Sequence, residues 1–181
     1  AIGENSKITF QYFQWNVEKK MELRHDGAVY KVSPWALSWN DGNYYLIAYD
    51  GEKGIIKHFR VDKMLHIELN GEKREGKQVF QSFDMAAYAR KMFGMYGGKE
   101  EWVRIECDNS FAGVMIDRFG KDVSMIRLDD KRFVVNVEVA VSRQFLAWII
   151  SLGEGVTLVG PDNVVEMMNI EIDRLIKQYK K

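Results

Sequence analysis

Closely spaced turn signals in the first 69 residues are the feature that most constrains the fold of this chain. Asp26-Gly27, Asn40-Asp41-Gly42 and Asp50-Gly51 separate short runs that are rich in β-branched and aromatic residues. Such runs predict strands at residues 7–15, 21–25, 28–33, 43–50, 55–60 and 64–69. We expect Pro34 to end the third strand, because proline lacks the N–H that a ladder needs. No helix of ordinary length fits before residue 82, so the first part is predicted to be a small β-barrel.

The hydrophobic period changes after this part. Residues 84–93 have the pattern of a short helix, and Gly94 follows them. The pattern then alternates between strands and helices, in the order strand 102–107, helix 110–119, strands 123–128 and 132–141, helix 143–152, strand 156–160 and helix 163–179. This βαββαβ order with an extra C-terminal helix matches the split βαβ arrangement of ferredoxin-like domains. The whole chain is therefore expected to be an α+β protein.

A run of glycines and charges at residues 70–77 separates the two patterns and predicts a solvated linker. We expect a β-barrel at residues 1–70, a linker with a short helix at 71–99, and a ferredoxin-like domain at 100–181. The chain begins with Ala1 in place of Met. We therefore expect that a further domain precedes it in the full protein.

The charges sum to zero, with 26 Lys and Arg against 26 Asp and Glu. This balance argues against a uniformly basic protein that coats DNA. The sum hides a basic middle, since residues 70–99 hold six basic and three acidic side chains, and an acidic end, since residues 100–181 hold eleven and fourteen. No apolar run approaches the roughly 20 residues that span a bilayer, and no secretion signal is evident. A single cysteine, Cys107, fits the reducing cytoplasm, where we place the protein.

Signals of catalysis are weak. The three histidines lack metal-binding spacing, and neither a Gly-x-Gly-x-x-Gly motif nor a Walker loop is present. Cys107 lies in an apolar strand, where an inert core thiol is the better interpretation. The sequence therefore predicts no catalytic residue, no metal and no cofactor, and we do not expect an enzyme.

An aromatic strand and a basic strand follow each other in the first part. Residues 43–50 alternate Tyr45, Ile47 and Tyr49 with Tyr44, Leu46 and Ala48, so one set should face the core and the other should be partly exposed. The exposed set is either a second packing surface or a surface on which planar ligands stack.

Five basic side chains come directly afterwards: Lys53, Lys57, His58, Arg60 and Lys63. His58 and Arg60 share one strand face, while Phe59 and Val61 point toward the core. Together with the aromatic strand, this cluster favours a nucleotide or a single-stranded nucleic acid as ligand. Arg60 is the strongest single candidate, because a guanidinium binds phosphate bidentately.

Three segments of the first part resemble WYL domains: Val32-Ser-Pro-Trp-Ala-Leu37, Asp41-Gly-Asn-Tyr-Tyr-Leu46 and His58-Phe-Arg-Val-Asp-Lys-Met64. The Trp-Tyr-Leu triplet that names the family appears here as Tyr44-Tyr45-Leu46, with one aromatic residue exchanged for another. The second part is similar to the C-terminal extension that often follows WYL domains, in Trp148-Ile-Ile-Ser-Leu-Gly153 and Leu158-Val-Gly-Pro161.

The resemblance implies an Sm-like or SH3-like β-barrel followed by a ferredoxin-like extension. It implies a bacterial transcription regulator that forms a homodimer, senses a ligand with its barrel, and contacts promoter DNA through an N-terminal helix-turn-helix domain absent from this chain. The matching ligand residues are Ser33, Trp35, Tyr45, His58, Arg60 and Lys63, with Tyr12 from the first strand. Two alternatives remain: a structural oligomerisation module without a ligand, or part of a nucleic-acid-processing enzyme whose catalytic domain lies elsewhere.

Overall fold

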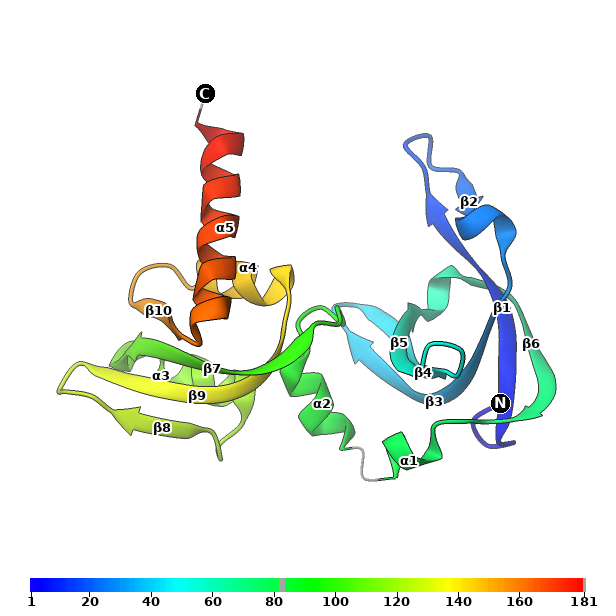
Figure 1. The fold of residues 1–181 in the computed structure, drawn as a ribbon, viewed down its shortest axis with the longest axis horizontal. Helices are drawn as coiled ribbons and strands as arrows, with labels where there is room; N and C mark the ends of the chain where they lie inside the picture. Colours follow the sequence, from blue (N-terminus) through cyan, green and yellow to red (C-terminus); the bar gives the residue numbers. More distant parts are fainter. Residues whose placement is uncertain (82–83, 181) are drawn as a thin grey trace. The chain divides into compact units, whose positions relative to one another are not determined.

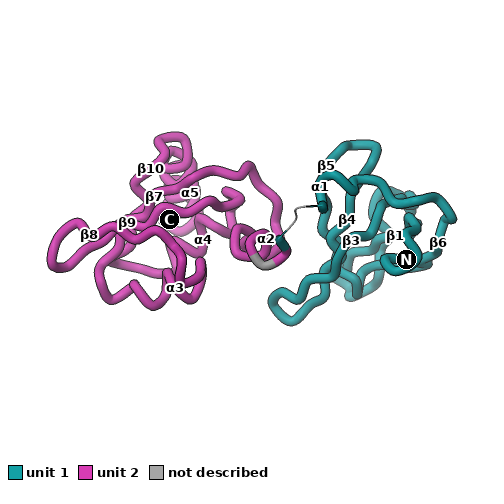
Figure 2. The backbone as a smooth tube through the Cα atoms, turned by 90° about the horizontal axis from the view of Figure 1, so that it is seen from below, with its two compact units in different colours: residues 1–84 teal, residues 85–181 magenta. Residues whose placement is uncertain are grey.

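The computed structural model describes residues 1–81 and 84–180, which form two compact units (Figure 2). Unit 1 comprises Ala1–Asp84 and unit 2 comprises Met85–Lys181. Each unit has a hydrophobic core of its own, built only from residues of that unit. The structure thus combines an all-β sheet with a second, mixed unit, which gives the expected α+β class.

Unit 1 is a curled, antiparallel, six-stranded sheet (Figure 1). Its strands are β1 (Ser6–Trp15), β2 (Met21–Leu23), β3 (Tyr30–Asn40), β4 (Asn43–Asp50), β5 (Ile55–Arg60) and β6 (Met64–Lys73). β1 pairs with β2, β3 and β6, and β4 lies between β3 and β5. Strand alternation places Phe10, Val32, Leu46 and Phe59 on the inner face, where they form the core.

The first hairpin differs from the prediction. β2 pairs with β1, and a turn at Asn16 connects them, since its side-chain oxygen accepts the N–H groups of Glu18 and Lys20. The Asp26-Gly27 pair does not connect two paired strands. Residues Arg24–Gly27 form a 3-10 turn, and β3 then pairs with β1.

We expected Pro34 to end its strand, and this prediction is wrong. β3 continues to Asn40, and Pro34 and Ala36 lie opposite Ala48 and Ile47, which leaves Trp35 unpaired in a bulge. Proline is tolerated at a bulge because the ladder is already interrupted there.

The segment expected to be a solvated linker belongs partly to the sheet. β6 continues to Lys73, and a four-residue helix, α1 (Lys77–Phe80), follows. Arg74 and Glu75 also donate hydrogen bonds to β3, to the carbonyl of Pro34 and the hydroxyl of Ser33. The Gly/charge composition therefore marks a segment that is packed against the sheet.

Unit 2 is a four-stranded antiparallel sheet in the order β10-β7-β9-β8 (Figure 1). Its elements are α2 (Met85–Lys91), β7 (Lys99–Asp108), α3 (Ala112–Phe119), β8 (Ser124–Arg127), β9 (Arg132–Val141), α4 (Arg143–Ser151), β10 (Val156–Gly160) and α5 (Asp162–Tyr179). The predicted order of strands and helices is thus confirmed, with boundaries shifted by a few residues.

Helices α3 and α4 cover one face of this sheet. Met115 of α3 and Phe145 of α4 share a core with Val103 and Val135 of the central strands. The first turns of α5 join this core through Val164 and Met168, and the rest of the helix projects away from the sheet (Figure 1). Within residues 1–81 and 84–180, no helix combines the length and the apolarity needed to cross a bilayer.

Candidate functional site

The face of β4 and β5 that points away from the core carries the central residues of the predicted site. Phe59 and Val61 pack against the core, as the alternation predicted. Tyr45 and Arg60 therefore share the opposite face, and they lie directly across from each other on neighbouring strands. His58, two residues before Arg60, lies on the same face and is half-buried.

Arg60 is held by a carboxylate two residues away. Its Nε donates to Oδ1 of Asp62 at 3.0 Å, and its Nη2 donates to Oδ2 at 2.8 Å. This paired geometry raises the pKa of Arg60 and lowers the pKa of Asp62. About a third of the Arg60 side chain remains exposed. An anionic ligand must therefore share Arg60 with Asp62 or displace it.

Tyr12 packs against the core of unit 1, on the other side of the sheet from the side chains of Tyr45 and Arg60. Its ring belongs to an aromatic cluster with Phe10, Tyr30 and Phe59. Its hydroxyl accepts the backbone N–H of Arg60 at 3.0 Å, which fixes the end of β5 against β1. Burial raises the pKa of Tyr12, so the hydroxyl stays protonated at neutral pH.

Ser33 and Trp35 are engaged by the segment that follows β6. The hydroxyl of buried Ser33 accepts the N–H of Glu75 at 2.9 Å, and Nε1 of Trp35 donates to the Glu75 carbonyl at 2.8 Å. The Trp35 ring stacks on Phe80 at 4.9 Å, and the Arg74 guanidinium lies 4.1 Å from the ring centre. At this end, the outer face is a packing surface covered by residues 74–80.

The basic cluster is partly neutralised within itself. Lys57 pairs with Asp50, whose carboxylate is buried. Lys63 ends a 3-10 turn after β5 and lies close enough to Asp62 to lower the pKa of that carboxyl. Asp62 thus bonds to Arg60 and lies in the field of Lys63, and a phosphate group could take the place of its carboxylate.

One polar hollow was not predicted from the sequence. It has a volume of about 300 Å³, and Lys7, Lys31, Ser33, Glu72 and Glu75 contribute to its lining. Lys7 is buried, and its Nζ lies 2.8 Å from Glu75 and 2.9 Å from Glu72, which raises its pKa. Both glutamates lie more than 60 residues after Lys7 in the chain, so no local sequence pattern connects them with Lys7.

The part of the chain that the structure describes gives little support for metal binding or for a reactive thiol. No group of three or more histidine, cysteine or acidic residues there is arranged to hold a metal ion. Cys107 lies in the core of unit 2, as predicted, and burial raises the pKa of its thiol to about 11. The thiol is therefore protonated at neutral pH.

Comparison with known protein families now identifies the two units. The WYL domain family matches residues 1–69, and the WCX domain family matches residues 99–176. The chain is a WYL domain followed by a WCX domain. The first match covers most of the sheet that carries Tyr45 and Arg60, and the second covers all four strands of unit 2.

Two solved structures are similar to the WYL–WCX chain. Proteasome accessory factor B/C (PafBC) of Arthrobacter aurescens is 20% identical with a TM-score of 0.41, over 100% of this chain and 26% of that one. A protein described as CRISPR Cas-related is 12% identical with a TM-score of 0.51, over 99% of this chain and 49% of that one. This chain thus spans about a quarter and about half of their lengths. No curated protein matches it.

Proposed function

We propose that this WYL–WCX chain is the ligand-sensing region of a bacterial transcriptional regulator. Its WYL domain would bind an anionic ligand, such as a nucleotide or a single-stranded nucleic acid. The observation that carries the proposal is the direct opposition of Tyr45 and Arg60 on β4 and β5. A tyrosine ring stacks on a base, and a guanidinium binds phosphate bidentately. The two domain assignments support the regulatory role.

In this scheme the ligand binds only when it displaces Asp62 from Arg60. Asp62 occupies the guanidinium of Arg60 in the way that a phosphate would. The ligand phosphate replaces it and is held by Arg60 and Lys63, with His58 on the same face. Ser33 and Trp35 come into contact with ligand only where residues 74–80 move aside, because that segment now covers them. Tyr12 does not contact the ligand in this scheme; its hydroxyl accepts the backbone N–H of Arg60 and so holds the end of β5 in place.

Such a movement provides a route from the ligand to the regulatory output. Unit 2 begins at Met85, a few residues after this segment. We propose that the displacement of residues 74–80 is passed along the chain to unit 2. We propose that the regulator is a homodimer and that ligand binding shifts the population of dimer arrangements. Exposed apolar side chains on α5 support a contact between protomers: Ile170, Ile172 and Ile176.

The DNA-binding domain belongs, in this proposal, to a part of the regulator that precedes Ala1. Promoter DNA is contacted there, in the cytoplasm, and the chain itself performs no catalysis. For the folds, we propose an Sm-like or SH3-like barrel in unit 1 and a ferredoxin-like domain in unit 2. The curled antiparallel sheet supports the first assignment, and the βαββαβ order in one antiparallel sheet supports the second.

The test is a binding titration of the 181-residue chain with labelled oligodeoxythymidine and with nucleoside monophosphates. Arg60→Ala should weaken binding roughly tenfold or more, because a hydrogen bond to a charged group contributes about 1.5–3 kcal/mol. Asp62→Asn should strengthen binding, since it removes the competing carboxylate. Arg127→Ala is the matched control, because Arg127 also pairs with a nearby carboxylate, that of Asp130. Equal affinities of wild type and Arg60→Ala would contradict the proposal.

A structural oligomerisation module is the second candidate. The cover over Ser33 and Trp35 favours it, because these aromatic and polar groups already have partners in the protein. Analytical ultracentrifugation, together with the same titrations, separates the two. A dimer that binds none of the probes supports the structural module and excludes the sensor for these ligands.

A further inference from the structure

The second face of the unit 2 sheet carries an exposed tryptophan. Along β7, Val103 and Ile105 point into the core, so Trp102 and Arg104 point to the opposite face. Trp102 is 65% exposed, although it lies on a central strand of the sheet. Glu138 and Asn136 of β9 lie directly opposite these two residues. An exposed indole on an antiparallel sheet can stack on a planar ring.

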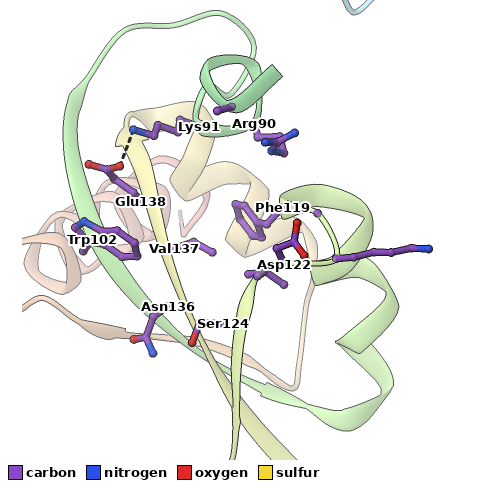
Figure 3. A pocket seen from close by; sticks show the side chains of 13 residues that line it. Arg90, Lys91, Trp102, Phe119, Asp122, Ser124, Asn136, Val137 and Glu138 are labelled. Atoms are coloured by element: carbon purple, nitrogen blue, oxygen red, sulfur yellow. Dashed lines mark ion pairs between the residues drawn. The ribbon is translucent and has the colours of Figure 1, made fainter. Parts of the chain in front are cut away.

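Trp102 lines two hollows. The larger one is not confined to this face, because Phe119 and Val137, which contact the core on the other face, line it too. The larger has a volume of about 540 Å³ and is formed by α2, β7, β9 and the segment between α3 and β8 (Figure 3). The smaller, of about 280 Å³, is also lined by Arg104 and Val159. Asn136 contributes to both hollows. The larger volume lies within the roughly 300–1,000 Å³ typical of small-molecule sites.

The charges around the larger hollow are only partly compensated. Lys91 is neutralised by Glu138 at 2.6 Å and Glu100 at 2.9 Å. Arg90 and Lys121 line the same hollow and form no ion pair among the described residues, while Asp122 is the remaining carboxylate there. Figure 3 shows Arg90 on the same side of the hollow as Phe119 and Asp122, across from Trp102.

Hydrogen-bonding groups complete the lining. Ser124 of β8 and Asn136 of β9 are paired neighbours on their strands, and both line the larger hollow. A serine hydroxyl and a carboxamide each donate and accept hydrogen bonds, so they match the edge of a nucleobase. The lining of the larger hollow thus combines an aromatic ring, two groups that donate and accept hydrogen bonds, and two cations without an ion pair among the described residues.

We propose that this face of the WCX domain is a second ligand site, which binds a nucleobase bearing a phosphate. Trp102 stacks on the base, Ser124 and Asn136 contact its edge, and Arg90 and Lys121 bind the phosphate. The site is separate from the one on the WYL domain and does not depend on it. The same chemistry is present in a free nucleotide and in a single-stranded nucleic acid, and the test distinguishes them.

The experiment follows the indole N–H of Trp102 by NMR, in the 181-residue chain that carries Arg60→Ala to silence the first site. The resonance is assigned by its loss in Trp102→Phe. Adenosine monophosphate or a short oligodeoxythymidine should shift it, and inorganic phosphate alone should not. A response to the monophosphate indicates a free nucleotide, and a response to the oligonucleotide alone indicates a single strand; either supports the proposal.

Affinity measurements on variants complete the test. In the Arg60→Ala chain, Trp102→Ala should weaken binding roughly fivefold to a hundredfold, the range typical of one stacked base. Trp39→Ala is the control, since Trp39 is exposed to a similar degree on unit 1. Arg90→Ala with Lys121→Ala should weaken the binding of adenosine monophosphate more than that of adenosine. An unchanged Trp102 resonance with every probe, or equal losses for the two tryptophan variants, would overturn this proposal without affecting the site at Arg60.

Discussion

Arg60 illustrates how a single residue can look available in the sequence and be engaged in the structure. The side chain faces outward beside Tyr45, as the strand pattern predicted. Its guanidinium is nevertheless bonded at two atoms to Asp62. An exposed ion pair such as Arg60–Asp62 contributes only about 0–1 kcal/mol to stability, because water solvates the separated charges almost as well. In the proposed function, this small net energy means that a ligand phosphate would displace Asp62 at little cost.

Asp50 is a residue whose contribution to stability can be measured. Its carboxylate accepts the N–H groups of Glu52 and Lys53, closes the turn after β4, and pairs with Lys57. An asparagine keeps an acceptor for the turn and loses the ion pair. We expect Asp50→Asn to lower the free energy of unfolding by about 1–3 kcal/mol at neutral pH, as measured by urea denaturation.

This stabilisation should depend on pH. Burial opposes the ionisation of Asp50, but hydrogen bonds from Lys57 and from the turn outweigh it, so its pKa lies below the ordinary 3.8. The difference between wild type and Asp50→Asn should persist above about pH 4 and shrink as the pH falls through the lowered pKa. Asp117→Asn, at an exposed position on α3, is the control. A difference that is the same at pH 7 and pH 2 would contradict the assignment.

At the scale of elements, the segment between β6 and α2 decides how much of the WYL face is accessible. Residues 74–80 of this segment contact Trp35, one of the predicted site residues, and Tyr49 of the aromatic strand. Its close approach needs a glycine, because Gly76 has a φ of +83° and a Cβ there would lie 2.6 Å from Cγ of Tyr49. The composition of the segment thus serves packing as well as solubility.

Gly76→Ala tests this packing. Alanine is strained at a positive φ and also collides with Tyr49, so we expect a lower melting temperature and looser packing of residues 74–80. Gly71→Ala is the matched control, since Gly71 has a φ of +77° and no neighbour within 4 Å. The difference between the variants should be roughly 1–3 kcal/mol, the usual cost of overpacking. Equal losses in thermal denaturation would show that the contact with Tyr49 contributes nothing.

The whole molecule is organised around two hydrophobic cores. Phe10 is at the centre of the core of unit 1, Phe145 is at the centre of the core of unit 2, and both are almost completely buried. Because neither core contains a residue of the other unit, we expect each to melt as a cooperative unit of its own.

Differential scanning calorimetry of two matched variants tests this expectation. Phe10→Ala should lower the transition of unit 1, and Phe145→Ala should lower that of unit 2, each by the equivalent of about 3–5 kcal/mol. The other transition should stay in place in both cases. A single transition that both substitutions shift equally would show that the two units unfold together.

Local patterns in the sequence determined much of this protein. Alternation over residues 55–60 correctly placed Phe59 in the core, because a strand's period of two fixes the face of each side chain. Over residues 43–50 the alternation defined two sets without deciding which faces the core, and the structure places Leu46 and Ala48 there. Alternation also left Arg60 on the opposite face, and the structure places Tyr45 directly across from it. The order of elements in unit 2 was predictable for a similar reason, since its periodic segments are long.

Only the tertiary structure decided which of those outward groups meet a partner. Residues 74–80 cover Ser33 and Trp35, and Glu75 reaches Lys7, although nearly seventy residues separate them in the chain. Trp102 shows the opposite outcome, since its side chain stays largely exposed although it lies on a central strand of the sheet. Periodicity states the direction of a side chain, whereas its neighbours depend on which distant segments the folded chain brings to the same place.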